Sequence, residues 1–159
     1  HELYELLILE SFQAGLSWEC VLNKRDSFRH AYDNFDIEKV IKYDEKDISR
    51  LLSDTGIIRN RLKIQASIRN SIVFKELQQE FGSFDSYIWG FSNGKVVDED
   101  CMKFTHSDLS DKISADLQHR GMKYVGTTII YSYLQAIGII NGHSSKCFKF
   151  VNHNALTKR

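Results

Sequence analysis

A carboxylate inside an apolar run is the first feature of this sequence that could do chemistry. Glu10 lies in a segment whose apolar residues fit a helix and almost surround it, so its side chain is expected close to buried surface. A buried carboxylate costs free energy unless it has a partner or a function. Either Glu10 finds a backbone donor or an arginine near the helix end, or it is a pocket acid beside Trp18. Gly15 and Ser17 separate the two residues, which predicts a sharp corner between two helices.

A second candidate for chemistry is a pair of metal-ligating side chains near the end of the chain. His143 and Cys147 are separated by three residues, which is the spacing of half a tetrahedral zinc site. Two further ligands are needed. Cys20, Cys101 and His1 are the candidates, but none of them forms a second paired motif. From the residues alone, either His143 and Cys147 belong to a zinc site or the chain has no metal site.

Two glycines mark a third candidate, a turn between two helices that could contact phosphate. Gly121 and Gly126 bracket a short segment that contains Lys123. Glycine lets the main chain approach a phosphate closely, and the start of the second helix offers free N–H groups and a positive dipole end. This pattern predicts a helix-hairpin-helix motif that binds the DNA backbone. An ordinary turn between helices explains the same residues equally well.

Helical periodicity and polar caps predict the elements that must position these residues. The expected caps are Ser17, Asp36, Asp44 with Asp47, and Ser83. Segment 96–107 is expected to be a loop in which Val96 and Val97 allow a brief extended piece, and no alternating series elsewhere predicts a sheet. The fold class is therefore all-α, a helical bundle with a helix-hairpin-helix motif. Helices are expected over residues 1–14, 17–32, 37–42, 45–53, 57–82, 84–91, 107–120 and 127–138.

The longest expected helix carries a basic face beside its apolar one. Arg59, Arg61, Lys63 and Arg69 lie near its start. Such a run is usually a solvated face. The alternative is a helix start directed at phosphate, where backbone amides and arginines act together.

Composition places few limits on function. The 159 residues suffice for one domain with a substantial core. Lys plus Arg and Asp plus Glu number 21 each, so the net charge neither supports nor excludes a nucleic-acid partner. Three cysteines do not form a disulfide framework, and no apolar run is long enough for a membrane span. We therefore expect a soluble, cytoplasmic protein that does not bind membranes.

Several separate motifs occur in order between residue 2 and about residue 148. They are Leu9-Glu10-Ser11-Phe12-Gln13-Ala14-Gly15-Leu16-Ser17-Trp18, Val21-Leu22-Asn23-Lys24-Arg25, Gly56-Ile57-Ile58-Arg59-Asn60-Arg61-Leu62-Lys63-Ile64, Phe81-Gly82-Ser83-Phe84, Arg120-Gly121-Met122-Lys123-Tyr124-Val125-Gly126-Thr127-Thr128, Tyr131-Ser132-Tyr133-Leu134-Gln135-Ala136 and Asn141-Gly142-His143. Together they resemble the DNA-3-methyladenine glycosylase I family. The resemblance implies a single all-α helix-hairpin-helix domain over residues 1–148, and we expect residues 149–159 to be a mobile tail. It also implies a monofunctional enzyme that flips 3-methyladenine out of alkylated double-stranded DNA and hydrolyses its glycosidic bond, acts as a monomer and holds a structural zinc.

The resemblance also implies roles for single residues. Glu10 is the pocket glutamate that hydrogen-bonds the methylated base, Trp18 stacks on the base and Ser132 lines the same pocket. Because an ionised carboxylate favours a cationic base over neutral adenine, we expect Glu10 to be held ionised. Gln13 and Leu16 fill the gap left in the duplex. His143 and Cys147 are two of four zinc ligands. The residues implied to contact the DNA backbone are Gly121, Lys123, Val125, Gly126, Thr127 and Thr128.

One departure from the family pattern leaves alternatives open. The family has an N-terminal segment with the other two zinc ligands and further aromatic pocket walls, and the sequence matches the family only from beyond that segment. The alternative functions are therefore a catalytically inert or truncated helix-hairpin-helix module that binds DNA, and a helical interaction domain without a nucleic-acid role. No Asp or Glu follows Asp116, which leaves Glu10 as the carboxylate for the pocket.

Overall fold

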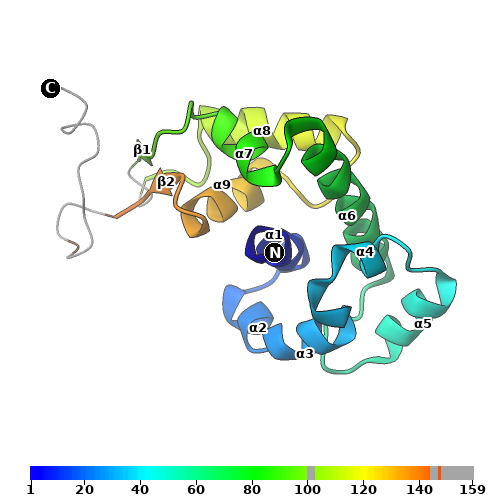
Figure 1. The fold of residues 1–159 in the computed structure, drawn as a ribbon. Helices are drawn as coiled ribbons and strands as arrows, with labels where there is room; N and C mark the ends of the chain where they lie inside the picture. The colour runs from blue at the N-terminus through cyan, green and yellow to red at the C-terminus, as the bar shows by residue number, and fades with distance from the viewer. Residues whose placement is uncertain (100–102, 144–146, 148–159) are drawn as a thin grey trace, which may run out of the picture.

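The computed structural model describes residues 1–99, 103–143 and 147, and the regular structure in this part of the chain is almost entirely helical (Figure 1). The prediction of an all-α fold is confirmed. The expected tail over residues 149–159 lies outside the described residues. In chain order the elements are α1 (Glu2–Gln13), α2 (Trp18–Leu22), α3 (Arg25–Ala31), the 3-10 helix η1 (Asp33–Phe35), α4 (Ile37–Val40), α5 (Glu45–Ser53), α6 (Arg61–Phe81), α7 (Phe84–Gly90), β1 (Val97–Asp98), α8 (Asp108–His119), α9 (Thr127–Ala136) and β2 (Ile140–Asn141).

Polar side chains cap the helices where the sequence predicts them. Each cap oxygen accepts a hydrogen bond from a free N–H in the first turn of its helix, which fixes where the helix begins. Asp44 and Asp47 form a reciprocal capping box at the start of α5. The other predicted caps that the structure confirms are Ser17, Asp36 and Ser83.

The single helix predicted over residues 17–32 is wrong, because the chain forms α2 and α3 with a break at Asn23 and Lys24. The Lys24 ammonium donates hydrogen bonds to the carbonyl oxygens of Thr55 and Gly56, at 3.3 Å each. These contacts join residues more than thirty positions apart, so helical periodicity in one window does not contain them. The break turns α3 toward the segment that precedes α6.

The start predicted for the longest helix is also too early. α6 begins at Arg61, because Asn60 takes an extended backbone conformation and its Oδ1 accepts the Lys63 N–H at 3.1 Å. Ile57 is buried before the helix starts. An asparagine cap thus decides the boundary, whereas the apolar spacing that starts at Ile57 belongs to the core and not to the helix.

A minimal sheet occurs where none was expected. β1 and β2 pair in parallel, with Val97 opposite Ile140 and Asp98 opposite Asn141. Strands of two residues are too short to show alternation, and the partners lie 43 positions apart. This pairing brings the segment after α9 beside the segment after α7.

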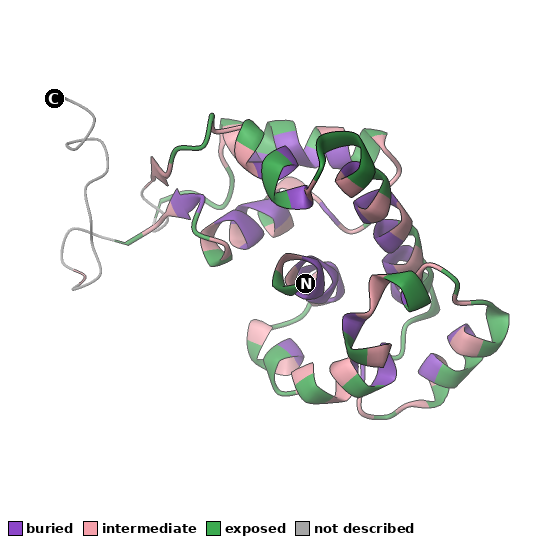
Figure 2. Cartoon of the chain, in the orientation of Figure 1, coloured by how far each residue is buried: buried purple, intermediate pink, exposed green. Residues whose placement is uncertain are grey.

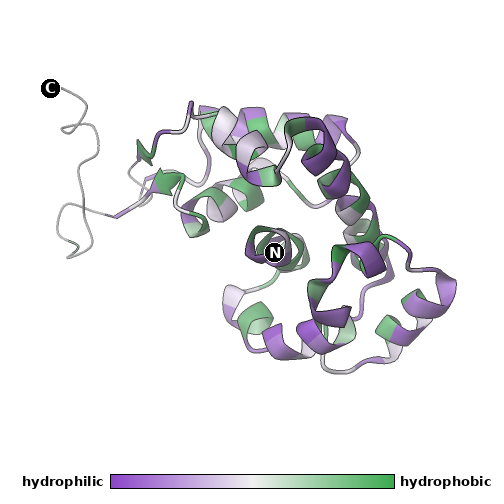
Figure 3. Ribbon diagram, in the orientation of Figure 1, coloured by the Kyte–Doolittle hydropathy of each residue, from purple (hydrophilic) through white to green (hydrophobic). Residues whose placement is uncertain are grey.

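α1 is the central helix of the fold. Figure 1 shows it along its axis in the middle of the molecule, where it packs against α2, α6 and α9. Much of its surface is buried in Figure 2 and apolar in Figure 3. Buried tyrosines around it satisfy their hydroxyls: Tyr4 bonds Ser71 at 2.6 Å, and Tyr133 donates to the Leu3 carbonyl at 3.0 Å. A polar group without a partner is therefore the exception in this core.

None of the helices in the described part of the chain combines the length and apolar character needed to cross a bilayer.

Candidate active site and nucleic-acid interface

Glu10 is buried in α1 and has no hydrogen-bond partner in the described part of the chain. Its exposed fraction is 0%, and neither carboxyl oxygen is bonded. The interpretation in which Glu10 pairs with an arginine is wrong. Arg25 and Arg29 instead donate to Glu5, at 2.6 and 3.0 Å. Glu5 lies in the first turn of α1.

Burial also affects the protonation state of Glu10. It raises the pKa of this carboxyl to about 8, because no donor or cation compensates for the water it has lost. In the free protein this favours the protonated form, and the ionised form expected beside a cationic base stays a prediction. The protonated carboxyl can donate one hydrogen bond and accept another.

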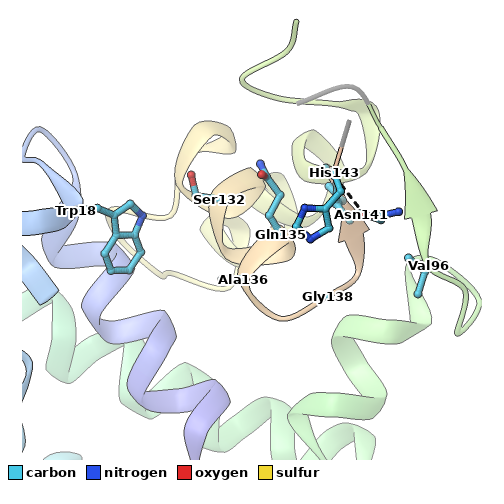
Figure 4. A pocket seen from close by; sticks show the side chains of 10 residues that line it. Trp18, Val96, Ser132, Gln135, Ala136, Gly138, Asn141 and His143 are labelled. Carbon is cyan, nitrogen blue, oxygen red and sulfur yellow. Dashed lines mark hydrogen bonds between the residues drawn. The ribbon is translucent and has the colours of Figure 1, made fainter. Parts of the chain in front are cut away.

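A cavity of about 680 Å³ lies beside the start of α2 and along α9 (Figure 4). Trp18 and Ser132, predicted to share a pocket, both line it. Glu10 does not line it. Its helix, α1, packs against α9, whose residues line the cavity. The base-binding and catalytic roles of these residues stay predictions.

Eight further residues line the cavity, and none of them was predicted for it. Gln135 follows Ser132 by three positions on α9, so helical spacing could have identified it. Asn141 and Val96 carried no such signal, because they reach the cavity through the β1–β2 pairing. Figure 4 shows Gln135 and His143 on the side of the cavity opposite Trp18.

The turn between α1 and α2 (residues 14–17) presents the residues predicted to fill a gap in DNA. Gly15 has φ of 77°, a conformation that glycine adopts without strain, and it ends α1 as predicted. Leu16 is 38% exposed, a large fraction for an apolar side chain. The Gln13 amide donates to the Leu16 carbonyl at 2.5 Å and so braces the turn.

A second turn, the hairpin turn (residues 120–126), joins α8 to α9. Gly121 has φ of 100°, and a Cβ there would lie 2.8 Å from the Arg69 guanidinium, so glycine is required. Gly126 is the N-cap of α9 and supplies no side-chain cap. No side chain at position 126 therefore caps the first N–H groups of α9. A helix start that binds phosphate needs such free N–H groups.

The side chains of the hairpin turn differ in what they can offer DNA. Lys123 and Thr128 are exposed. Val125 is 1% exposed, so its side chain belongs to the core and only its backbone could contact DNA. The Thr127 hydroxyl is bonded to Ser110 and Asp111, which leaves it less available than the sequence suggested.

The basic residues at the start of α6 are not one solvated face. Arg59 is exposed, as that interpretation requires. Lys63 is buried, and its ammonium donates to backbone carbonyls of α1 and the residue after it. Arg69 donates to the Arg120 carbonyl at 3.0 Å. Arg61 pairs with Glu45 of α5 at 2.5 Å. Three of the four cations thus connect parts of the fold, which spacing along one helix does not reveal.

The two predicted zinc ligands lie close together. The Sγ of Cys147 is 3.6 Å from Nδ1 of His143. A tetrahedral ion with ordinary Zn–S and Zn–N bond lengths holds its sulfur and nitrogen about 3.6 Å apart. Among the described residues no group of three or more His, Cys, Asp or Glu is placed to hold a metal. Cys101, another candidate ligand, lies outside the described residues.

Comparisons with known proteins identify the family to which this fold belongs. The sequence profile of the methyladenine glycosylase family matches residues 1–150. DNA-3-methyladenine glycosylase 1 of Escherichia coli (strain K12) is 41% identical over 150 residues, which cover 92% of this chain and 80% of that protein. A crystal structure of 3-methyladenine DNA glycosylase I superposes with a TM-score of 0.89 at 40% identity and covers 94% of this chain and 85% of its own.

A further solved structure is a variant of 3-methyladenine DNA glycosylase I in complex with 3-methyladenine. It superposes with a TM-score of 0.90 at 32% identity over 96% of this chain and 84% of its own. The fold is thus that of an all-α DNA glycosylase. The chain belongs to the methyladenine glycosylase family.

Proposed function

We propose that this protein removes 3-methyladenine from alkylated double-stranded DNA by hydrolysing the bond between base and sugar. The observation that carries the proposal is the match of almost the whole chain to enzymes of this name, one of them solved with 3-methyladenine bound. The reaction leaves the DNA strand uncut. In this respect the protein acts as a monofunctional base-excision repair enzyme.

The cavity is where the damaged base is bound. A base inside a duplex must leave the stack first, which costs a few kcal/mol, and stacking on an aromatic side chain offsets part of that cost. Trp18 supplies the ring. Methylation at N3 gives the adenine of DNA a positive charge, so a ring face attracts it more than it attracts neutral adenine. Ser132 and Gln135 add polar contacts from α9.

Glu10 supplies the hydrogen-bonding carboxyl for that base. A buried carboxyl without a partner is rare in folded proteins, and a ligand that satisfies it gains a hydrogen bond that water does not compete for. A cationic base nearby favours the ionised carboxylate and lowers its pKa from about 8. The carboxylate then balances the positive charge of the damaged base inside the site. The same positive charge already makes the base a good leaving group.

The two turns contact the DNA itself. The exposed Lys123 and the start of α9 approach the phosphate backbone, where binding does not depend on sequence. Leu16, exposed in the α1–α2 turn, fills the gap that the flipped base leaves, and Gln13 contacts the opposite base. A duplex bound by both turns is held while the base leaves it.

The test is release of free bases from methylated duplex DNA, separated by chromatography. Wild-type protein should release 3-methyladenine selectively, and Glu10→Gln should lower the rate about a hundredfold or more, as loss of a group aimed at the reacting base does. The matched control is Glu2→Gln, an exposed carboxylate on the same helix, which should not change the rate. Full activity in Glu10→Gln would remove the role of that residue. No release by the wild-type chain would leave an inert DNA-binding module as the better interpretation.

The proposal includes a structural zinc ion, for which the described residues supply two ligands. His143 and Cys147 have the spacing of two ligands of one tetrahedral ion. Such an ion would stabilise the segment that follows β2 and would take no part in catalysis. Metal content of the purified protein, measured by mass spectrometry, should be near one zinc per chain and should fall in Cys147→Ser. Equal zinc in both proteins would contradict the assignment of Cys147.

A further inference from the structure

Lys63, in the first turn of α6, is a buried cation that bonds backbone instead of a carboxylate. It is 8% exposed, and its ammonium donates to the carbonyl oxygens of Phe12 at 2.8 Å and Ala14 at 2.5 Å. These carbonyls lie at the C-terminal end of α1, where a helix has unsatisfied carbonyls and the negative end of its dipole. α1 has no basic residue in its own last turn. Lys63 supplies that charge from another helix.

The same ammonium also contacts the hairpin turn. It lies 5.7 Å from the centre of the Tyr124 ring, within the range of a cation–π interaction. Tyr124 has φ of 55°, so its backbone is in the left-handed region and depends on its surroundings for this conformation. One charged group therefore joins the end of α1 to the middle of the hairpin turn.

Asn70 secures the hairpin turn from the same helix. Its amide donates to the Lys123 carbonyl at 2.9 Å, and its Oδ1 accepts the Lys123 N–H at 2.8 Å. Asn70 follows Lys63 by seven residues, close to two helical turns or about 10.5 Å along the axis, so both side chains leave the same side of α6. α6 thus determines the separation of the α1–α2 turn and the hairpin turn.

We propose that Lys63 and Asn70 are positioning residues that set the α1–α2 turn at a fixed distance from the hairpin turn. The inference rests on the proposed function, in which one turn contacts phosphate and the other fills the gap in the duplex. If their separation changes, DNA bound by the hairpin turn no longer meets Leu16 at the depth that base extrusion needs. Neither positioning residue lines the cavity, so binding of the free base does not depend on them.

The central experiment compares two substitutions of the same kind on α6. Lys63→Met keeps the apolar stem and removes the charge and its donors, whereas Lys75→Met removes a cation that pairs with Glu38 on α4, away from both turns. Two quantities are measured, kcat/KM for excision from methylated duplex DNA and the affinity for free 3-methyladenine by calorimetry. For Lys63→Met, kcat/KM should fall by about ten- to a hundredfold, the effect of a misplaced substrate, with affinity for the free base unchanged. Lys75→Met should change neither.

Two outcomes overturn the proposal, namely unchanged excision in Lys63→Met, or excision and free-base affinity that fall by the same factor. If Lys63→Met does not fold, Asn70→Asp is measured in its place, because it keeps the acceptor for the Lys123 N–H and loses the donor to the Lys123 carbonyl. The same split between excision and free-base binding is expected, and its absence overturns the proposal.

A measurement without catalysis separates this proposal from the proposed function. Amide hydrogen exchange should be faster in Lys63→Met than in Lys75→Met in both the α1–α2 turn and the hairpin turn, because one ammonium contacts both. Faster exchange in only one turn, or in neither, overturns the coupling. If the wild-type chain releases no base, the proposed function fails while this result still decides the coupling.

Discussion

Glu10 in α1 and Lys63, which contacts the end of α1 from α6, are both buried, but in the described part of the chain only Lys63 has hydrogen-bond partners. Lys63 bonds two carbonyls and faces a tyrosine ring, while neither oxygen of Glu10 has a partner. A buried polar group with partners stabilises an arrangement of the chain, and one without partners destabilises it. The contrast indicates that Lys63 serves the geometry of the protein and Glu10 serves a ligand.

The largest expected effect on stability is that of Glu10→Gln with pH. Because burial raises the folded-state pKa from 4.5 to about 8, wild-type stability is full below pH 4.5 and falls as pH rises through about 8. Glutamine does not titrate. The variant should therefore equal the wild type near pH 4 and exceed its free energy of unfolding by up to about 4 kcal/mol at pH 7.5, at 1.36 kcal/mol per pKa unit. Denaturant unfolding at several pH values measures this. A constant difference between the proteins would show that Glu10 is not destabilised by burial.

Lys63→Met should act in the opposite direction. Two carbonyls at the end of α1 lose their donor, so the free energy of unfolding should fall by about 2 kcal/mol at neutral pH. Lys75→Met, with its exposed ion pair, should change it by less than about 1 kcal/mol. Urea unfolding of both variants provides the comparison. If Lys63→Met were as stable as the wild type, the distinction between the satisfied and unsatisfied group would fail.

The smallest expected effect is that of Lys123→Ala, whose side chain is exposed in the hairpin turn. The fold should be unaffected. Affinity for DNA should fall equally for all sequences, and the slope of log affinity against log salt concentration should decrease by about one, because one phosphate contact is lost. Titrations of two unrelated duplexes at several salt concentrations measure both. A loss for only one duplex would contradict a phosphate contact and would make the hairpin turn a reader of sequence.

The family, the all-helical fold and most helix boundaries could be predicted from the sequence. The caps at Ser17 and Asp44 and the glycines at positions 15 and 121 act on neighbours a few residues away, so their effect is visible in a short window. The burial of Glu10 was also visible there, because apolar residues surround it at helical spacing. Local interactions are the part of the fold that the order of residues determines directly.

Tertiary structure alone decided which charged and polar groups have partners. Lys63 bonds carbonyls 49 and 51 positions away, and Arg25 and Arg29 pair with Glu5 and leave Glu10 alone. Lys24 lies at the break in the helix predicted over residues 17–32, and it bonds carbonyls 31 and 32 positions away. The physical reason is that a buried charge is satisfied by whichever group packing brings within about 3 Å, and that distance is independent of separation along the chain.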